Sequence, residues 1–328
     1  MRQARIKVPA ELGAAVYHCM SRSVNGEWLF NKPAREVLRR QLWVVAEYCG
    51  VQVLTYAILS NHFHILVRVP QKTPVCDQEL LRRYRVLYPR PTRYQTTRLE
   101  VIERQLASDG PEARGWRKRQ LALMGDISPF MRLLKQRFSI WYNHAHNRFG
   151  TLWAERFRSL LLEPYGRALA TVAAYIDLNA VRARLVVDPK DYRFCGYAEA
   201  VAGRTEAQRG LAEVIGVTDW SEAQVVYRQL LFDTGSAARE QGASIPLVAL
   251  EKVLADGGRL PLGTVLRCRI RYFTDGAVLG SRAFVEEQLA VYRARTGRRE
   301  GTPICLLPPV TDWGELAALR RLRRRAFG

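Results

Sequence analysis

Two apolar runs separated by a polar break are the clearest feature of the hydrophobic pattern. The runs cover 51–59 and 63–69, and Ser60-Asn61 separates them. Short apolar runs bounded by turn residues are typical of buried strands. The stretch VQVLTYAILSNHFHILVRV therefore predicts a strand, a tight turn and a second strand, which together form a β-hairpin.

The residues before the hairpin predict a strand followed by a helix. The apolar run AAVYHCMSRS over 14–23 ends at the turn residues Asn25-Gly26, which is typical of a strand. We interpret His18, inside this run, as a core histidine. A helix is predicted after Asn31-Lys32-Pro33, because proline is tolerated in a first turn and apolar residues then recur with helical period. The order strand, helix, strand, strand is consistent with half of a ferredoxin-like sheet.

Further elements downstream complete this fold class. The pattern predicts a helix that begins at Ser128-Pro129 and ends near Asn143, a fourth strand over 157–162 and a helix over 166–186. We therefore predict an α+β domain over residues 1–200. It would hold a ferredoxin-like antiparallel sheet with helices on its faces.

The segment 70–126 interrupts this pattern with prolines and many arginines. We interpret it as a basic insertion on the core domain, and 99–124 within it has helical character. Two interpretations remain open for its charge, a solvated basic surface and an additional grip on DNA.

Residues 201–328 are predicted to form a mainly helical accessory region. Expected helices cover 221–232, 245–254, 262–273 and 282–295, with glycine turns between them. Short helices that end in a basic one are consistent with a helix-turn-helix, and an ordinary helical accessory domain is the alternative. The arginine run over 320–325 is expected to be a solvated basic tail.

Composition restricts the partners and the compartment. The chain has 328 residues, 48% of them hydrophobic, and no apolar run approaches the ~18 residues of a membrane span. Its N-terminal residues lack the apolar core of a secretory signal, and its six cysteines form no CxxC pair. These features indicate a reducing, cytoplasmic location. The net charge of +20 and the pI of about 10.2 point to a polyanionic partner, with nucleic acid ahead of an anionic membrane.

Four side chains have the spacing of a phosphodiester-cleaving site. His62 and His64 are two apart on a strand, so both imidazoles project from one face. Such a pair commonly binds a divalent metal, although a polar rim of the sheet is the alternative. Tyr175 and Asn179 are four apart and share one face of a helix. A metal could polarise a phosphate here while the tyrosine hydroxyl attacks it.

The segments SNHFHILV and YIDLNAVRARLV resemble the signature segments of HUH-type single-tyrosine transposases, in particular the REP-associated tyrosine transposases. The resemblance covers about residues 10–200, less well across 70–126. It implies that Tyr175 is the nucleophile, that His62, His64 and Asn179 hold Mg²⁺ or Mn²⁺, and that a 5′-phosphotyrosine intermediate forms. Ala180 departs from the family, which usually has proline there. The residues expected to contact DNA are Arg22, Arg156, Arg158 and Arg182.

The resemblance also implies a substrate, single-stranded DNA beside a hairpin in repeated palindromic elements, bound by a monomer or a homodimer. A replication initiator or relaxase would use the same logic, but those enzymes usually carry a lysine three residues after the tyrosine, and Leu178 stands there. A domesticated, non-catalytic DNA-binding regulator is a second alternative. A metal-dependent hydrolase is a third, and it would need a water-activating carboxylate, whereas Asp177 points off the Tyr175 face.

Overall fold

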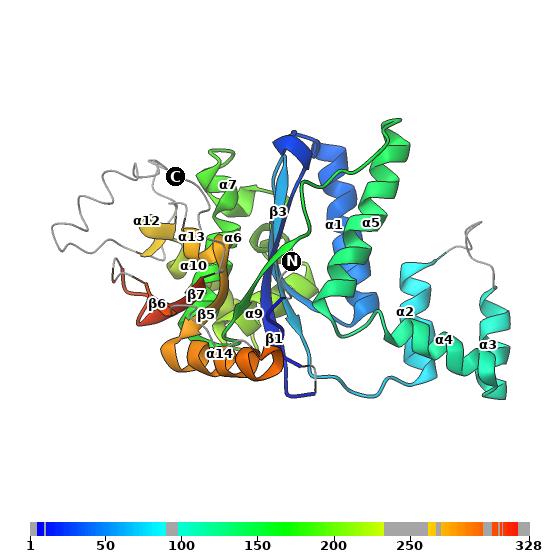
Figure 1. The fold of residues 1–328 in the computed structure, drawn as a ribbon. Coiled ribbons are helices and arrows are strands. Elements are labelled where there is room, and N and C mark those ends of the chain that lie inside the picture. The colour runs from blue at the N-terminus through cyan, green and yellow to red at the C-terminus, as the bar shows by residue number, and fades with distance from the viewer. Residues whose placement is uncertain are drawn as a thin grey trace.

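The computed structural model describes residues 5–9, 11–89, 98–232, 262–266, 270–297, 304–307, 309 and 311–320. Within these residues the fold is a mixed α/β arrangement around one seven-stranded sheet of order β2-β3-β1-β4-β5-β7-β6 (Figure 1). The strands are β1 (Ala15–Arg22), β2 (Gln52–Ile58), β3 (His62–Val69), β4 (Arg158–Leu162), β5 (Gly276–Ser281), β6 (Ile304–Leu306) and β7 (Leu316–Arg320).

The first half of the sheet has the predicted ferredoxin-like arrangement. β1 lies between β3 and β4, β2 lies at the edge beside β3, and all these neighbours are antiparallel. All four strands fall where the hydrophobic pattern predicts them. The fold class predicted from the sequence is therefore confirmed.

Helices cover both faces of this half-sheet. α1 and α5 pack together on one face, and α6 and α9 pack against β2 on the other (Figure 1). The larger helices are α1 (Lys32–Cys49), α2 (Asp77–Leu87), α3 (Leu99–Ser108), α4 (Pro111–Leu121), α5 (Ile127–Ala145), α6 (Gly166–Asp177), α9 (Thr205–Ile215), α10 (Trp220–Phe232) and α14 (Arg282–Thr296). The shorter ones are η1 (Val24–Gly26), α7 (Asn179–Arg182), η2 (Pro189–Asp191), α8 (Gly196–Val201), α12 (Leu262–Leu266) and α13 (Arg271–Asp275). In the part of the chain that the structure covers, no helix has both the length and the apolarity to cross a membrane.

Helix ends show how local sequence sets these elements. Asn31 caps α1, since its side-chain oxygen accepts a hydrogen bond from the Ala34 amide at 3.0 Å. Gly50 ends the same helix in the left-handed region, with φ of 63°. The start of α5 differs from the prediction: Asp126 caps the helix by accepting from the Ser128 amide at 2.6 Å, so Ser128 is not the cap.

The insertion over 70–126 forms a helical unit with a small core of its own. α2, α3 and α4 bury the side chains Leu80, Ile102, Leu106, Ala113 and Trp116. Several of its arginines pair with carboxylates, for example Arg82 with Glu79 and Arg117 with Asp77. Part of the positive charge of the insertion is thus neutralised locally. Its role in DNA binding stays a prediction.

The C-terminal region contains three strands that the sequence analysis did not predict. β5 lies where glycine turns were expected, and it pairs in parallel with β4, so the sheet continues across residue 200. The basic helix α14 follows β5 directly and packs on β5 and β7, so it is not the second helix of a helix-turn-helix. The expected helix over 245–254 and the basic tail beyond residue 320 lie outside the described residues. The division into two domains stays a prediction.

Gly210 allows α9 to approach β2 closely. A Cβ atom at this position would lie 2.6 Å from the carbonyl oxygens of Val53 and Leu54. These are backbone atoms of a strand, so they cannot move away as the end of a flexible side chain could. Gly115 in α4 is different, since a Cβ there would meet only the flexible end of Arg119, at 3.4 Å. Both glycines lie inside helices, so alanine should improve helix propensity at either position. A difference between the two substitutions therefore reports the packing against β2.

We expect Gly210→Ala to lower the free energy of unfolding by about 1–3 kcal/mol, because the added methyl group overpacks the contact with β2. Gly115→Ala is expected to raise it by about 0.5–1 kcal/mol, the usual gain for alanine inside a helix. Urea denaturation followed by circular dichroism measures both. Equal stabilisation by the two substitutions would contradict the close approach of α9 to β2.

Candidate active site

Strand register places the predicted site residues on one face of the sheet. Arg22 on β1 lies opposite His62 on β3. Met20, also on β1, lies opposite His64 on β3 at one side and opposite Arg158 on β4 at the other. Directly opposed residues of antiparallel strands project to the same side. The two histidines share a cavity with Tyr175, so this face of the sheet is the one that α6 covers.

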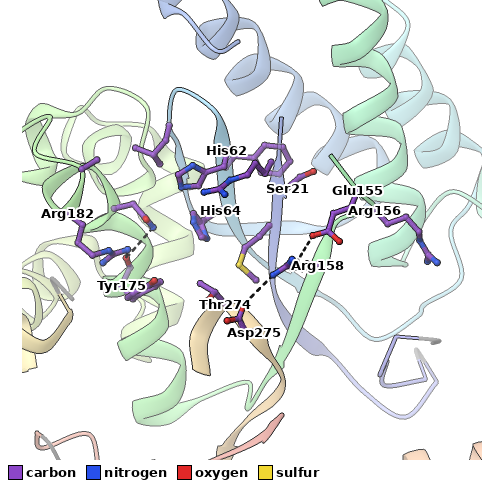
Figure 2. A pocket seen from close by; sticks show the side chains of 16 residues that line it. Ser21, His62, His64, Glu155, Arg156, Arg158, Tyr175, Arg182, Thr274 and Asp275 are labelled. Atoms are coloured by element: carbon purple, nitrogen blue, oxygen red, sulfur yellow. Dashed lines mark hydrogen bonds and ion pairs between the residues drawn. The ribbon is translucent and has the colours of Figure 1, made fainter. Parts of the chain in front are cut away.

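These side chains line a cavity of about 380 Å³ together with residues from α6, α7 and α13 (Figure 2). In the view of Figure 2, His62 and His64 lie between Tyr175 with Arg182 on one side and Arg158 on the other. Every site residue predicted from the sequence lines this cavity: Arg22, His62, His64, Arg156, Arg158, Tyr175, Asn179 and Arg182. The structure thus brings together residues from three distant parts of the chain, while their individual roles stay predictions.

His64 is held by a second histidine behind it. His18 is fully buried, as expected for a core histidine, but its Nε2 lies 2.8 Å from Nδ1 of His64. Its other ring nitrogen, Nδ1, lies 3.0 Å from the backbone carbonyl oxygen of Phe273. The interpretation of His18 as a core residue was therefore incomplete, because its ring connects α13 to the HxH strand.

Burial keeps both of these imidazoles neutral. Desolvation lowers the pKa of His18 to about 3, partly offset by its hydrogen bond to Phe273. The pKa of His64 is held well below its usual value by burial first, then by the charges of neighbouring histidines and of Arg182 and Arg22. The neutral form of imidazole is the form that ligates metals.

Hydrogen bonds also determine which nitrogen of each ring carries the lone pair. A carbonyl oxygen only accepts, so Nδ1 of neutral His18 carries the proton and its Nε2 accepts from Nδ1–H of His64. For His62, Nδ1 lies 2.7 Å from Oδ1 of Asn61, whose amide is oriented by its own donation to the Gly26 carbonyl at 3.0 Å. Both rings of the HxH pair thus have the lone pair on Nε2.

Tyr175 lies in the last turn of α6, where its ring is held between two groups. The Phe273 ring meets it edge-on, with 5.1 Å between the ring centroids, and the guanidinium of Arg182 lies over it at 3.8 Å. Arg182 is fixed in turn, since it donates to the carbonyls of Tyr175 at 2.7 Å and of Leu266 at 2.6 Å. No residue of the described ranges hydrogen-bonds the Tyr175 hydroxyl.

Asn179 presents an amide oxygen near the histidines. The predicted helix over 166–186 is interrupted at Leu178, between α6 and α7, yet Tyr175 and Asn179 still line the same cavity. The Asn179 amide nitrogen donates to the carbonyl of Ile176 at 3.1 Å, with a longer contact of 3.4 Å to that of Tyr175. Its carbonyl oxygen is therefore the atom that remains for a cation.

Two imidazoles and an amide oxygen fit a divalent cation. Such a mixed nitrogen and oxygen set could hold a divalent cation, and the identity of that cation as Mn²⁺ or Mg²⁺ stays a prediction. No cluster of three or more His, Cys, Asp or Glu side chains suited to a metal occurs in the part of the chain that is described. Asn179 is the residue of this cavity that could add an oxygen donor to the two histidines, and its role as a ligand stays a prediction.

The four predicted DNA-contacting arginines occupy different environments. Arg22 is exposed at the end of β1, and Figure 2 shows Arg156 pointing away from the histidines. Arg158 is held by two carboxylates, Glu155 at 2.7 Å and Asp275 at 3.3 Å. Arg182 holds Tyr175, and its expected contact with DNA stays a prediction.

Sequence reasoning missed several residues of the site. Glu155, Thr274 and Asp275 line the cavity, and none of them has a sequence pattern that links it to the HxH segment. His18 did have a signal, because it lies two residues before Met20 and so shares its strand face. The C-terminal residues could not be found this way, since only the pairing of β5 with β4 brings them to the site.

Asp177 lies off the Tyr175 face, as expected, and serves as a buried anchor for α6. Its carboxylate accepts from the Thr55 hydroxyl at 2.9 Å, the Tyr227 hydroxyl at 2.6 Å and the Tyr197 amide at 3.1 Å. Burial raises the pKa of this carboxyl to about 6, although these hydrogen bonds act in the opposite direction. Asp177 therefore ties the tyrosine helix to β2, α8 and α10.

Comparison with known proteins gives little beyond this geometry. No family model matches the chain, and no curated protein matches it. A solved structure described as "Structure of the REP associates tyrosine transposase bound to a REP hairpin" aligns with a TM-score of 0.39 and 15% sequence identity. The alignment covers 62% of this chain and 87% of that one. A similarity at this level does not assign an activity.

Asp177→Asn should remove one component of the pH dependence of stability. A carboxyl group with a raised pKa makes the folded state bind more protons between its unfolded pKa, ~3.9, and about 6, so its contribution to stability falls as pH rises through that window. We expect the wild-type unfolding free energy, minus that of Asp177→Asn, to fall by about 2 kcal/mol from pH 4 to pH 7. Urea denaturation at several pH values measures this difference, and a constant difference would contradict it.

Proposed function

We propose that the chain is a metal-dependent enzyme that cuts and rejoins single-stranded DNA through a covalent bond to Tyr175. The observation that carries this proposal is the shared cavity of Tyr175, Asn179 and the HxH pair. The tautomers support it, because both imidazoles have their lone pair on Nε2. The net charge of +20 supports a polyanionic substrate.

A divalent cation bound by His62, His64 and Asn179 would polarise the scissile phosphate and offset the charge that develops on it. The Tyr175 oxygen then attacks phosphorus and gives up its proton to solvent water. A new bond joins phosphorus to the tyrosine oxygen, and the bond to the 3′ oxygen breaks. The 3′ oxygen leaves with the bonding electrons and takes up a proton from solvent, which yields a 3′-hydroxyl and a 5′-phosphotyrosine. Attack by another 3′-hydroxyl reverses these steps and rejoins the strand.

The residues around Tyr175 would orient it for this attack. A phenol in water has a pKa of ~10 and is a weak nucleophile at neutral pH, so position and nearby positive charge matter. The Arg182 guanidinium lies over the ring and also holds the backbone carbonyl of Tyr175. Held in this way, the ring has little freedom to turn away from a phosphate.

Single-stranded DNA is the substrate class that the surroundings favour. Arg22 at the end of β1 is exposed beside the histidines, where it can meet a backbone phosphate. The HxH and tyrosine segments resemble those of REP-associated tyrosine transposases, and this resemblance favours a substrate in which a DNA hairpin lies next to the cut. An unpaired strand gives the phosphate access to a cavity of about 380 Å³ that a duplex would not enter easily.

Substitution of the HxH pair tests the metal. His62→Ala and His64→Ala should each abolish cleavage of a labelled hairpin oligonucleotide and weaken Mn²⁺ binding measured by calorimetry. Binding of the hairpin itself should change little, because phosphate contacts elsewhere supply most of the affinity. His144→Ala, an exposed histidine at the end of α5, is the matched control and should leave both properties intact. Full cleavage in the presence of EDTA would contradict a metal-dependent reaction.

Substitution of Tyr175 tests the covalent step. Wild-type protein incubated with labelled single-stranded DNA should retain label after boiling in detergent, and mass spectrometry should place it on the Tyr175 peptide. Tyr175→Phe keeps the ring between Phe273 and Arg182 and removes only the hydroxyl, so label and cleavage should vanish while the fold remains.

Tyr165→Phe is the control for this experiment. Tyr165 is 70% exposed, precedes α6 and does not line the cavity, so its loss should not change labelling. Cleavage that persists in Tyr175→Phe without a protein adduct would show a water nucleophile and overturn the proposal. Hairpin binding without any cleavage by the wild type would instead favour a non-catalytic regulator.

A further inference from the structure

We infer that His18 and the C-terminal segment 270–275 form a positioning relay that fixes the metal-binding tautomer of His64 and the place of Tyr175. The inference rests on the proposed function and extends it to residues outside the HxH and tyrosine motifs. It also gives the C-terminal region a role inside the site, in place of an accessory role only.

The relay begins at a backbone carbonyl, which cannot change its hydrogen-bonding role. The Phe273 oxygen accepts from Nδ1–H of His18 at 3.0 Å, and Nε2 of His18 accepts from Nδ1–H of His64 at 2.8 Å. Both rings are buried, with His18 at 0% and His64 at 6% exposure, so water does not compete for these bonds. The result is that Nε2 of His64 keeps its lone pair.

This arrangement matches what a metal requires of a histidine. Ligating imidazoles usually donate their second ring N–H to a fixed acceptor, which sets the tautomer and the ring orientation. Here that acceptor is a histidine ring rather than a carboxylate or a carbonyl. His18 can accept only because Phe273 occupies its other nitrogen, so the relay depends on α13 being in place.

The same C-terminal segment also contacts the tyrosine side of the cavity. The Phe273 ring packs edge-on against Tyr175, and Asp275 binds Arg158 at 3.3 Å on the opposite wall. Residue 266, just before this segment, accepts through its carbonyl from the Arg182 that covers Tyr175. Residue 266 and segment 270–275 therefore hold the nucleophile, two arginines and, through His18, a metal ligand.

Two substitutions of His18 separate hydrogen bonding from simple filling of space. In His18→Gln the amide can donate to the Phe273 carbonyl and accept from His64, as the imidazole does. In His18→Phe the ring fills the same space and can do neither. We expect His18→Phe to weaken Mn²⁺ binding by roughly 10–100-fold, the usual effect of losing such a partner, while His18→Gln stays within about threefold of wild type.

Nitrogen-15 NMR of the imidazoles gives a readout that needs neither metal nor DNA. The chain has five histidines, so their long-range ring correlations can be assigned by substitution. Wild type and His18→Gln should show His64 protonated on Nδ1, and His18→Phe should lose this preference. Circular dichroism recorded before and after the NMR measurement establishes that each variant is folded. If His18→Phe does not fold, the tautomer of His64 in His18→Gln still tests the relay.

Phe273→Leu tests the second part of the relay, the contact of the Phe273 ring with Tyr175. It keeps the backbone carbonyl and so should leave the His64 tautomer and Mn²⁺ affinity unchanged. Removal of the ring that packs against Tyr175 should slow formation of the protein–DNA adduct at least tenfold. Together the variants separate the effect of the relay on the metal ligand His64 from its effect on Tyr175.

The outcomes separate this inference from the proposed function. Unchanged His64 tautomer and Mn²⁺ affinity in His18→Phe, with labelling of Tyr175 intact in wild type, would overturn the relay alone. A wild-type protein that binds no Mn²⁺ and forms no adduct would overturn both. Loss of the tautomer in His18→Phe with retention in His18→Gln would establish the relay.

Discussion

The pairing of β1 with β3 in one register is the constraint on which the site depends. Side chains on a strand alternate with a period of two, so a slip of one residue would send the facing histidines and Met20 to opposite sides of the sheet. The register is held by burial on both faces, because nearly every residue of β1 and β3 is inaccessible to solvent. The same packing that forms the core therefore places the HxH pair beside His18 and in front of α6.

Buried polar groups form the second layer of this organisation. His18, His64, Asn179 and Asp177 are all nearly inaccessible, and each has partners in the protein. An unpaired polar group in such surroundings would cost free energy, so these hydrogen bonds restrict the side chains to one arrangement. A site built in this way is held in place before any ligand arrives, which reduces the free-energy cost of ordering it when a ligand binds.

Charge is distributed unevenly around the cavity. Arg158 is balanced by Glu155 and Asp275, whereas Arg22, which also lines the cavity, is exposed at the end of β1. In the insertion, several arginines of α2 and α4 also pair with carboxylates. The surplus of positive charge seen in the composition is therefore not spread evenly over the surface, and a polyanionic partner would meet it at particular places.

The sequence by itself determined the local elements and the residues that line the candidate site. Periodicity of two placed His62 and His64 on one face, and periodicity of 3.6 placed Tyr175 beside Asn179, because both are properties of a short stretch of chain. Turn residues and caps such as Asn31 also act over a few residues, and so the ferredoxin-like order of strands and helices could be predicted.

Only the tertiary structure decided what surrounds these residues. The bond from His18 to the Phe273 carbonyl joins positions 255 residues apart, and no pattern in either segment encodes it. Strand β5 was missed because its glycine-containing stretch 276–281 resembles a turn until the neighbouring strand β4 supplies hydrogen bonds, and β6 and β7 are only three and five residues long. The use of Arg182 was decided in the same way, since the Leu266 carbonyl and the Tyr175 ring meet it only in the folded chain.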